Sequence, residues 1–184
     1  ALRRLEKAHG ILVSLIDESP QNTEYLNSLG VVLWKMKHLS EAAYVLEKAL
    51  KLEPTFYRAR NNLGIVLYDL KRYQEAIDVW RQALSIKPDY AQAHFNMGTA
   101  LIQAGLYSQA VDAFNQCLKN SPDDAQAHNN LGLSLIKCDR ADEAIEHWRE
   151  AIKIDPNLAQ AFTNLGRALK EKESKEAPAT RSDS

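Results

Sequence analysis

The chain repeats itself every 34 residues, and this period constrains its fold more than any other feature of the sequence. Prolines recur at this interval, and so do glycines and alanines, with each series keeping its own place within the period. The series are Pro20, Pro54, Pro88, Pro122 and Pro156; Gly30, Gly64, Gly98, Gly132 and Gly166; and Ala8, Ala42, Ala76, Ala110 and Ala144. Three series in fixed register indicate an array of similar units stacked along the chain.

Within each period the apolar residues have the spacing of helices. In one unit, Leu63 and Leu67 fall on one face of a first helix, and Ile77 and Trp80 fall on one face of a second. Pro88 ends the second helix, because proline lacks the backbone donor that a helix interior requires. Each unit is therefore predicted to be a hairpin of two helices.

This pattern resembles the tetratricopeptide repeat (TPR) family. The residues that carry the likeness are Leu63-Gly64, Tyr68, Tyr73, Ala76, Trp80, Ala83 and Pro88 in one unit, and Leu131-Gly132, Ala144, Trp148, Ala151 and Pro156 in another. The likeness extends from residue 1 to about residue 173. It implies an all-α fold, a right-handed α-solenoid of antiparallel helix hairpins known as a TPR superhelix.

The period divides the chain into segments. We expect residues 1–22 to be the second helix of an incomplete N-terminal repeat, 23–56, 57–90, 91–124 and 125–158 to be four complete repeats, 159–173 to be a C-terminal capping helix, and 174–184 to be a disordered polar tail. The chain begins without methionine and in the middle of a unit, so we expect that a segment upstream has been removed.

The resemblance also implies that the first helix of each unit lines a concave groove, where TPR proteins bind peptides. Asparagine stands at one register of four successive first helices, and we call this set the asparagine ladder: Asn62, Asn96, Asn130 and Asn164. Neighbouring helices lie ~8–10 Å apart and an extended peptide advances ~3.3 Å per residue, so one amide would meet the peptide backbone about every three residues. A role in helix packing is the alternative for these amides.

The predicted partner-binding residues combine this ladder with further asparagines and with aromatic side chains on the same helices. They are Asn27, Trp34, Asn61, Asn62, Tyr68, Phe95, Asn96, Asn129, Asn130 and Asn164. Aromatic side chains are frequent anchors of protein interfaces. Burial against a neighbouring helix is the alternative for them, above all for Tyr68. Trp80 and Trp148 differ, because they fall at core positions of second helices, where we expect them to pack.

The sequence contains no pattern that favours catalysis. It has no phosphate-binding loop, dinucleotide fingerprint or nucleophile elbow. His94 and His128 share a register but have no third ligand at suitable spacing, and Cys117 and Cys138 form no CxxC pair. We therefore expect a protein that is not an enzyme and that has no cofactor and no metal site.

Charge and hydropathy limit the partners. With a net charge of −1, the chain lacks the positive field that attracts nucleic acid. It also lacks the run of ~18–20 apolar residues that direct membrane insertion requires. The two cysteines, with no signal peptide or glycosylation sequon, favour a cytoplasmic location, and the expectation of a removed upstream segment leaves an exported or membrane-tethered origin open.

Together these observations predict a non-catalytic protein–protein interaction scaffold, which binds a peptide segment of a partner in its concave groove through the asparagine ladder and the aromatic anchors. Two alternatives stay open. The chain is a structural TPR protein that forms a homo-oligomer through its incomplete repeat at residues 1–22, or it is the substrate-binding arm of a larger enzyme.

Overall fold

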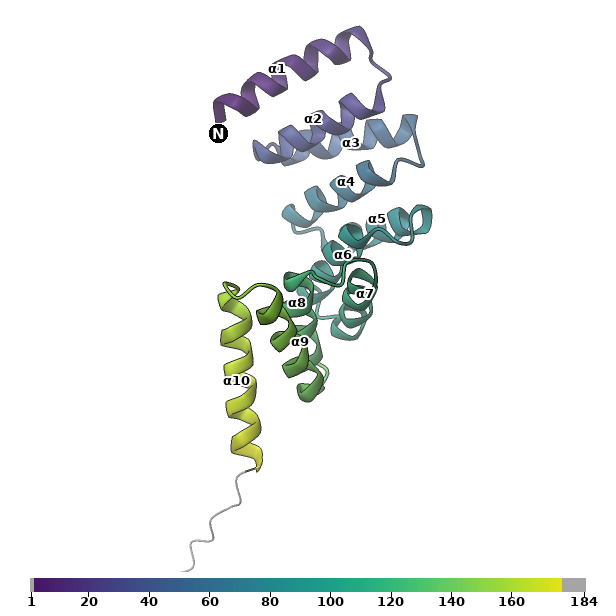
Figure 1. Cartoon of the computed structure of the whole chain (residues 1–184). Coiled ribbons are helices and arrows are strands. Elements are labelled where there is room, and N and C mark those ends of the chain that lie inside the picture. Colours follow the sequence, from purple (N-terminus) through teal and green to yellow (C-terminus); the bar gives the residue numbers. More distant parts are fainter. Residues whose placement is uncertain (1, 177–184) are drawn as a thin grey trace, which may run out of the picture.

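A computed structural model describes residues 2–176, and over this range the chain forms ten α-helices and no strand. The helices are α1 (Leu2–Glu18), α2 (Thr23–Lys35), α3 (Leu39–Leu52), α4 (Tyr57–Asp69), α5 (Tyr73–Ile86), α6 (Ala91–Gln103), α7 (Tyr107–Asn120), α8 (Ala125–Ile136), α9 (Ala141–Ile154) and α10 (Ala159–Glu176). They stack one after another into the all-α, right-handed TPR solenoid that the sequence predicts (Figure 1).

The stack is tighter on one side than on the other. The first helices (α2, α4, α6, α8 and α10) each contact the next member of this series. The second helices (α3, α5, α7 and α9) contact the first helices around them, but within residues 2–176 they do not contact one another. A stack that is closer on one side must curve toward it, so the first helices line the concave surface.

In each complete hairpin, a glycine of the first helix packs directly against one large side chain of the second helix. A Cβ atom built on Gly64 would lie 2.5 Å from Cε2 of Trp80, and one built on Gly132 would lie 2.7 Å from Cε2 of Trp148. The two tryptophans are 1% and 2% exposed, which confirms the expectation that they pack. The missing side chain of glycine therefore sets how closely the two helices of a hairpin approach.

The last helix is longer than the sequence suggested. It continues to Glu176, past the expected end at residue 173, so the first three residues of the expected tail are helical. Lysine and glutamate are good helix formers, and between Gly166 and Pro178 the sequence contains neither glycine nor proline. The remainder of that expected tail, residues 177–184, lies outside the described residues.

Membrane insertion can be judged for the helices of this range. None of the helices within residues 2–176 combines the length and the apolar character that a membrane span requires.

Two glycines at the same register of different repeats give a matched test of the hairpin contact. Gly64→Ala should destabilise the protein by about 1–3 kcal/mol, because the added methyl group collides with the buried Trp80 ring. Gly166→Ala should stabilise it by up to about 1 kcal/mol, because no atom lies within 4 Å of the new Cβ and alanine favours helix. Denaturant unfolding followed by circular dichroism measures both changes. Equal effects of the two substitutions would contradict the proposed role of the contact.

Candidate functional site

An apolar stripe runs along the concave surface. Each first helix from α2 to α8 contributes two side chains to it, one at the ninth and one at the twelfth position of its repeat: Val31, Trp34, Ile65, Tyr68, Thr99, Ile102, Leu133 and Ile136. These side chains are half-buried or exposed, whereas the core side chains behind them are buried. Leu133, for example, is 38% exposed. The groove therefore offers apolar surface to solvent over most of its length.

Asparagine amides join neighbouring first helices beside this stripe. Each of the three cross-helix hydrogen bonds runs from a ladder asparagine to an asparagine in the preceding repeat: Asn62 Nδ2 to Asn27 Oδ1 (2.8 Å), Asn96 Nδ2 to Asn61 Oδ1 (3.0 Å) and Asn164 Nδ2 to Asn129 Oδ1 (3.1 Å). Asn62, Asn96 and Asn164 are thus held in fixed orientations by the repeats that precede them.

Two of the predicted partner-binding asparagines lie beneath the groove surface. Asn61 and Asn129 are 3% and 1% exposed. Besides accepting the cross-helix bonds, their amides donate to Oδ1 of Asn62 at 3.5 Å and of Asn130 at 3.2 Å. For these two residues the geometry supports the packing alternative, and they would affect a ligand only through the ladder amides that they orient.

The cross-helix series is interrupted between α6 and α8. Phe95 stands on α6 at the register that Asn27, Asn61 and Asn129 hold on other first helices. Its ring packs edge-on against Phe114, with the ring centroids 5.8 Å apart. Asn130 consequently has no asparagine acceptor in the preceding repeat, and its Nδ2 donates no hydrogen bond to any group within residues 2–176. This half-buried amide is therefore available to an acceptor from outside the chain.

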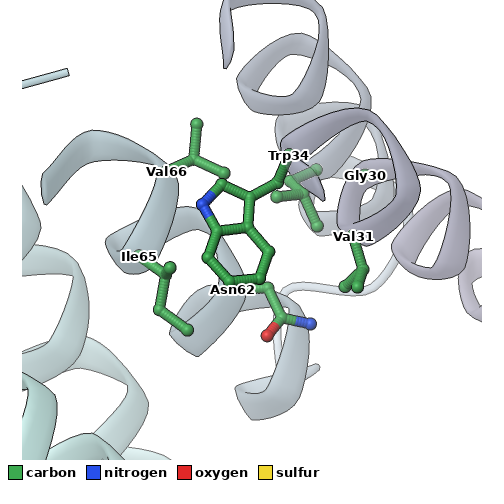
Figure 2. A pocket seen from close by; sticks show the side chains of 7 residues that line it. Gly30, Val31, Trp34, Asn62, Ile65 and Val66 are labelled. Atoms are coloured by element: carbon green, nitrogen blue, oxygen red, sulfur yellow. The ribbon is translucent and has the colours of Figure 1, made fainter. Parts of the chain in front are cut away.

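Trp34 is held across the junction of α2 and α4. Its indole Nε1 donates to Oδ2 of Asp69 at 2.9 Å, and Nζ of Lys37 donates to the same oxygen at 3.2 Å. Figure 2 shows the indole among Val31, Asn62, Ile65 and Val66, where it leaves a hollow of about 40 Å³. Trp34 therefore fills most of this depression itself and presents one side of its ring to the groove.

The depression recurs between α4 and α6, where Tyr68 takes the register of Trp34. The hollow there is about 100 Å³, and Ile65, Phe95, Asn96 and Thr99 line it together with Tyr68. Burial raises the pKa of the Tyr68 phenol above its ordinary value, so the hydroxyl stays neutral and can both donate and accept a hydrogen bond.

The histidines of α6 and α8 share one hydrogen-bond partner type and differ at the ring nitrogen Nδ1. Each ring donates from Nε2 to a proline carbonyl oxygen, His94 to Pro88 at 2.9 Å and His128 to Pro122 at 3.1 Å. In His128 the remaining nitrogen, Nδ1, accepts from Nδ1 of His147 at 3.0 Å. Burial, and then the neighbouring His128, lower the pKa of His147. Sequence reasoning missed His147, because it lies on a second helix.

Metal ligands do not gather anywhere in the part of the chain that the structure describes. No group of three or more histidine, cysteine, aspartate or glutamate side chains there is arranged to hold a metal ion. Cys117 is buried, and burial raises the pKa of its thiol to about 11, so it remains protonated and unreactive at neutral pH.

Family models match the chain from residue 33 to residue 159. A model described as TPR repeat matches residues 66–105, and two described as tetratricopeptide repeat match residues 95–159 and 33–79. No curated protein matches the chain.

Solved structures with the same fold include two TPR proteins at low sequence identity. YrrB, a TPR protein with an unusual peptide-binding site, is 24% identical, with a TM-score of 0.78 over 90% of this chain and 85% of that chain. A crystal structure of MamA is 23% identical, with a TM-score of 0.77 over 85% and 91%. MamA from Desulfovibrio magneticus RS-1 is 24% identical, with a TM-score of 0.76 over 85% and 90%. These likenesses show the fold.

The neighbouring pair Asn129 and Asn130 tests which amides hold the array together. Asn129→Ala should destabilise the protein by about 1–3 kcal/mol, because the buried Asn129 amide loses two hydrogen bonds, the one that it accepts from the half-buried Asn164 and the one that it donates to Asn130. Asn130→Asp keeps the oxygen that accepts from the buried Asn129 Nδ2 and removes only the Nδ2 that donates no hydrogen bond, so it should change the stability by less than about 1 kcal/mol. The free energy of unfolding of the two variants, measured in urea, tests this assignment, and a larger loss for Asn130→Asp than for Asn129→Ala would refute it.

Proposed function

We propose that this chain, which belongs to the tetratricopeptide repeat family, is a non-catalytic scaffold that binds an extended peptide segment of a partner protein in its concave groove. The observation that carries the proposal is the apolar stripe on the first helices, exposed beside oriented amides. The TPR fold itself favours a role in protein–protein interaction. The likeness to YrrB, which has a peptide-binding site, is a further argument for a peptide ligand.

The amides of the groove suit a peptide backbone. The Nδ2 groups of Asn62 and Asn96 are engaged with the preceding repeats. Each Oδ1 already accepts one hydrogen bond, in Asn62 from Asn61 and in Asn96 from Gln92, which leaves one lone pair of each oxygen free. These two residues would therefore accept hydrogen bonds from peptide N–H groups, whereas the free Nδ2 of Asn130 would donate to a peptide carbonyl group. Because the amides are already oriented, little side-chain entropy is lost on binding.

The apolar stripe would recognise the side chains of the bound peptide. The hollow between α4 and α6, which Tyr68 and Phe95 line, has room for part of an apolar side chain. Burying such a side chain contributes ~25 cal/mol per Å² of apolar surface removed from water. The backbone contacts would then hold many sequences, and the hollows would select among them.

A groove variant tests the proposal. Thr99→Glu combined with Leu133→Glu places two carboxylates on the apolar stripe and should abolish capture of partner proteins from a native lysate, because the charges lose hydration on contact with an apolar ligand. Tyr44→Glu is the control, since Tyr44 is 69% exposed on the second helix α3. Circular dichroism verifies that both variants are folded.

The captured proteins, identified by mass spectrometry, are then mapped with overlapping synthetic peptides. The proposal expects one or more short segments that bind wild type and the Tyr44→Glu control but not the groove variant. Partners that all three baits retain equally would place the interaction on another surface and refute the groove.

Self-association through α1 is the second candidate function. The observation that favours it is the exposure of large apolar side chains on this helix, Leu2 at 61%, Ile11 at 51% and Val13 at 38%. If α1 joins two copies, wild type should sediment as a concentration-dependent oligomer and Ile11→Glu as a monomer. A wild-type protein that sediments as a monomer at every concentration would exclude this candidate.

A further inference from the structure

The depression between successive first helices recurs in register, but it is much larger at the junction of α8 and α10. The hollow measures about 40 Å³ between α2 and α4 and about 310 Å³ between α8 and α10. Dedicated ligand sites have volumes of ~300–1,000 Å³, so only the larger of these two reaches that range.

Two substitutions in the repeat account for the difference. Ile136 takes the register that Trp34 holds at the first junction, and Ala168 takes that of Val66. The indole and the two methyl groups that fill the first depression are therefore absent from the later one. Trp148 is larger than its counterpart Leu46, but it packs down onto Gly132 and forms the floor of the hollow.

The wall of the larger hollow also changes from apolar to cationic. Arg167 takes the register of Ile65, and Lys137 lines the same rim. Both side chains are exposed, and neither forms an ion pair with any group within residues 2–176. Glu171 also lines the rim, while Lys170 projects from the same helix one residue earlier, so the surroundings remain positive overall.

We propose that the hollow between α8 and α10 is the specificity-determining subsite of the groove and takes a large apolar side chain flanked by an aspartate or glutamate side chain. The apolar side chain lies against Leu133, Ile136 and Trp148, and the carboxylate pairs with Lys137 and Arg167. This inference rests on the proposed peptide-binding function, and it names the chemistry of the segment that the groove selects.

The full chain is immobilised and used to select peptides from a random-peptide phage library. This selection measures the preference for an acidic residue beside an apolar one without knowledge of the partner. Wild type should enrich peptides that carry an acidic residue next to a large apolar one. Lys137→Gln combined with Arg167→Gln should lose the enrichment of the acidic residue and keep that of the apolar one. The matched control is Lys48→Gln with Lys51→Gln, which removes two exposed cations of α3 and should leave the selection unchanged.

The selected peptide is then synthesised for fluorescence polarisation. Replacing its acidic residue by the amide should weaken binding to wild type about tenfold, because a charge-assisted hydrogen bond is lost, and should leave binding to the Lys137→Gln, Arg167→Gln variant unchanged. Ile136→Trp, which restores the indole found at the first junction, should fill the hollow and weaken binding of the same peptide at least as much.

The outcomes separate this inference from the function on which it rests. Peptides that bind wild type, fail on the Thr99→Glu, Leu133→Glu variant and show no acidic preference would overturn the inference and leave the groove function standing. Loss of binding on amidation of the C-terminus alone would also overturn it, because the carboxylate would then be the chain end. If no peptide is enriched over an empty support, the inference and the groove function fall together.

Discussion

The contact between a glycine of one helix and a large side chain of the next is the interaction on which the rest of the structure depends. At Gly64 and Gly132 no side chain other than hydrogen fits, because the Trp80 and Trp148 rings lie where a Cβ atom would be. This contact fixes the spacing of each hairpin. Since each hairpin packs only on its neighbours, the same spacing, repeated, sets the curvature of the array and turns the first helices inward.

The fold could be predicted from the sequence because the same packing contact occurs in several repeats and leaves the same residue pattern in each of them. The glycine series and the Trp80 and Trp148 positions anticipated the core, and the period anticipated the stack of helices. The roles of the asparagines could not be assigned in that way. Asn61 and Asn62 are adjacent in sequence and similar in chemistry, yet only the structure shows that Asn61 is buried and Asn62 borders the groove. The hydrogen bonds that distinguish them join residues of different repeats, and nothing local in the sequence encodes them.

The groove is uniform in backbone and varied in side chains. The junctions described above share one depression, but Trp34 nearly fills it at one end and the combination of Ile136 and Ala168 opens it at the other. Such variation leaves the glycine contact in place, because neither Ile136 nor Ala168 takes part in the contact between Gly132 and Trp148. A repeat fold can therefore change what each junction accepts without changing the stack, which explains why function was harder to predict here than architecture.

The presence of Phe95 in place of an asparagine affects how strongly neighbouring repeats are coupled along the array. Amide hydrogen bonds join α2 to α4, α4 to α6 and α8 to α10, but none of them spans α6 and α8. In a one-dimensional array the coupling energy between neighbours decides how far a local opening spreads. The junction of α6 and α8 therefore relies on packing without an amide hydrogen bond, so a local opening on one side of it is less strongly coupled to the other side than at a junction that such a bond spans.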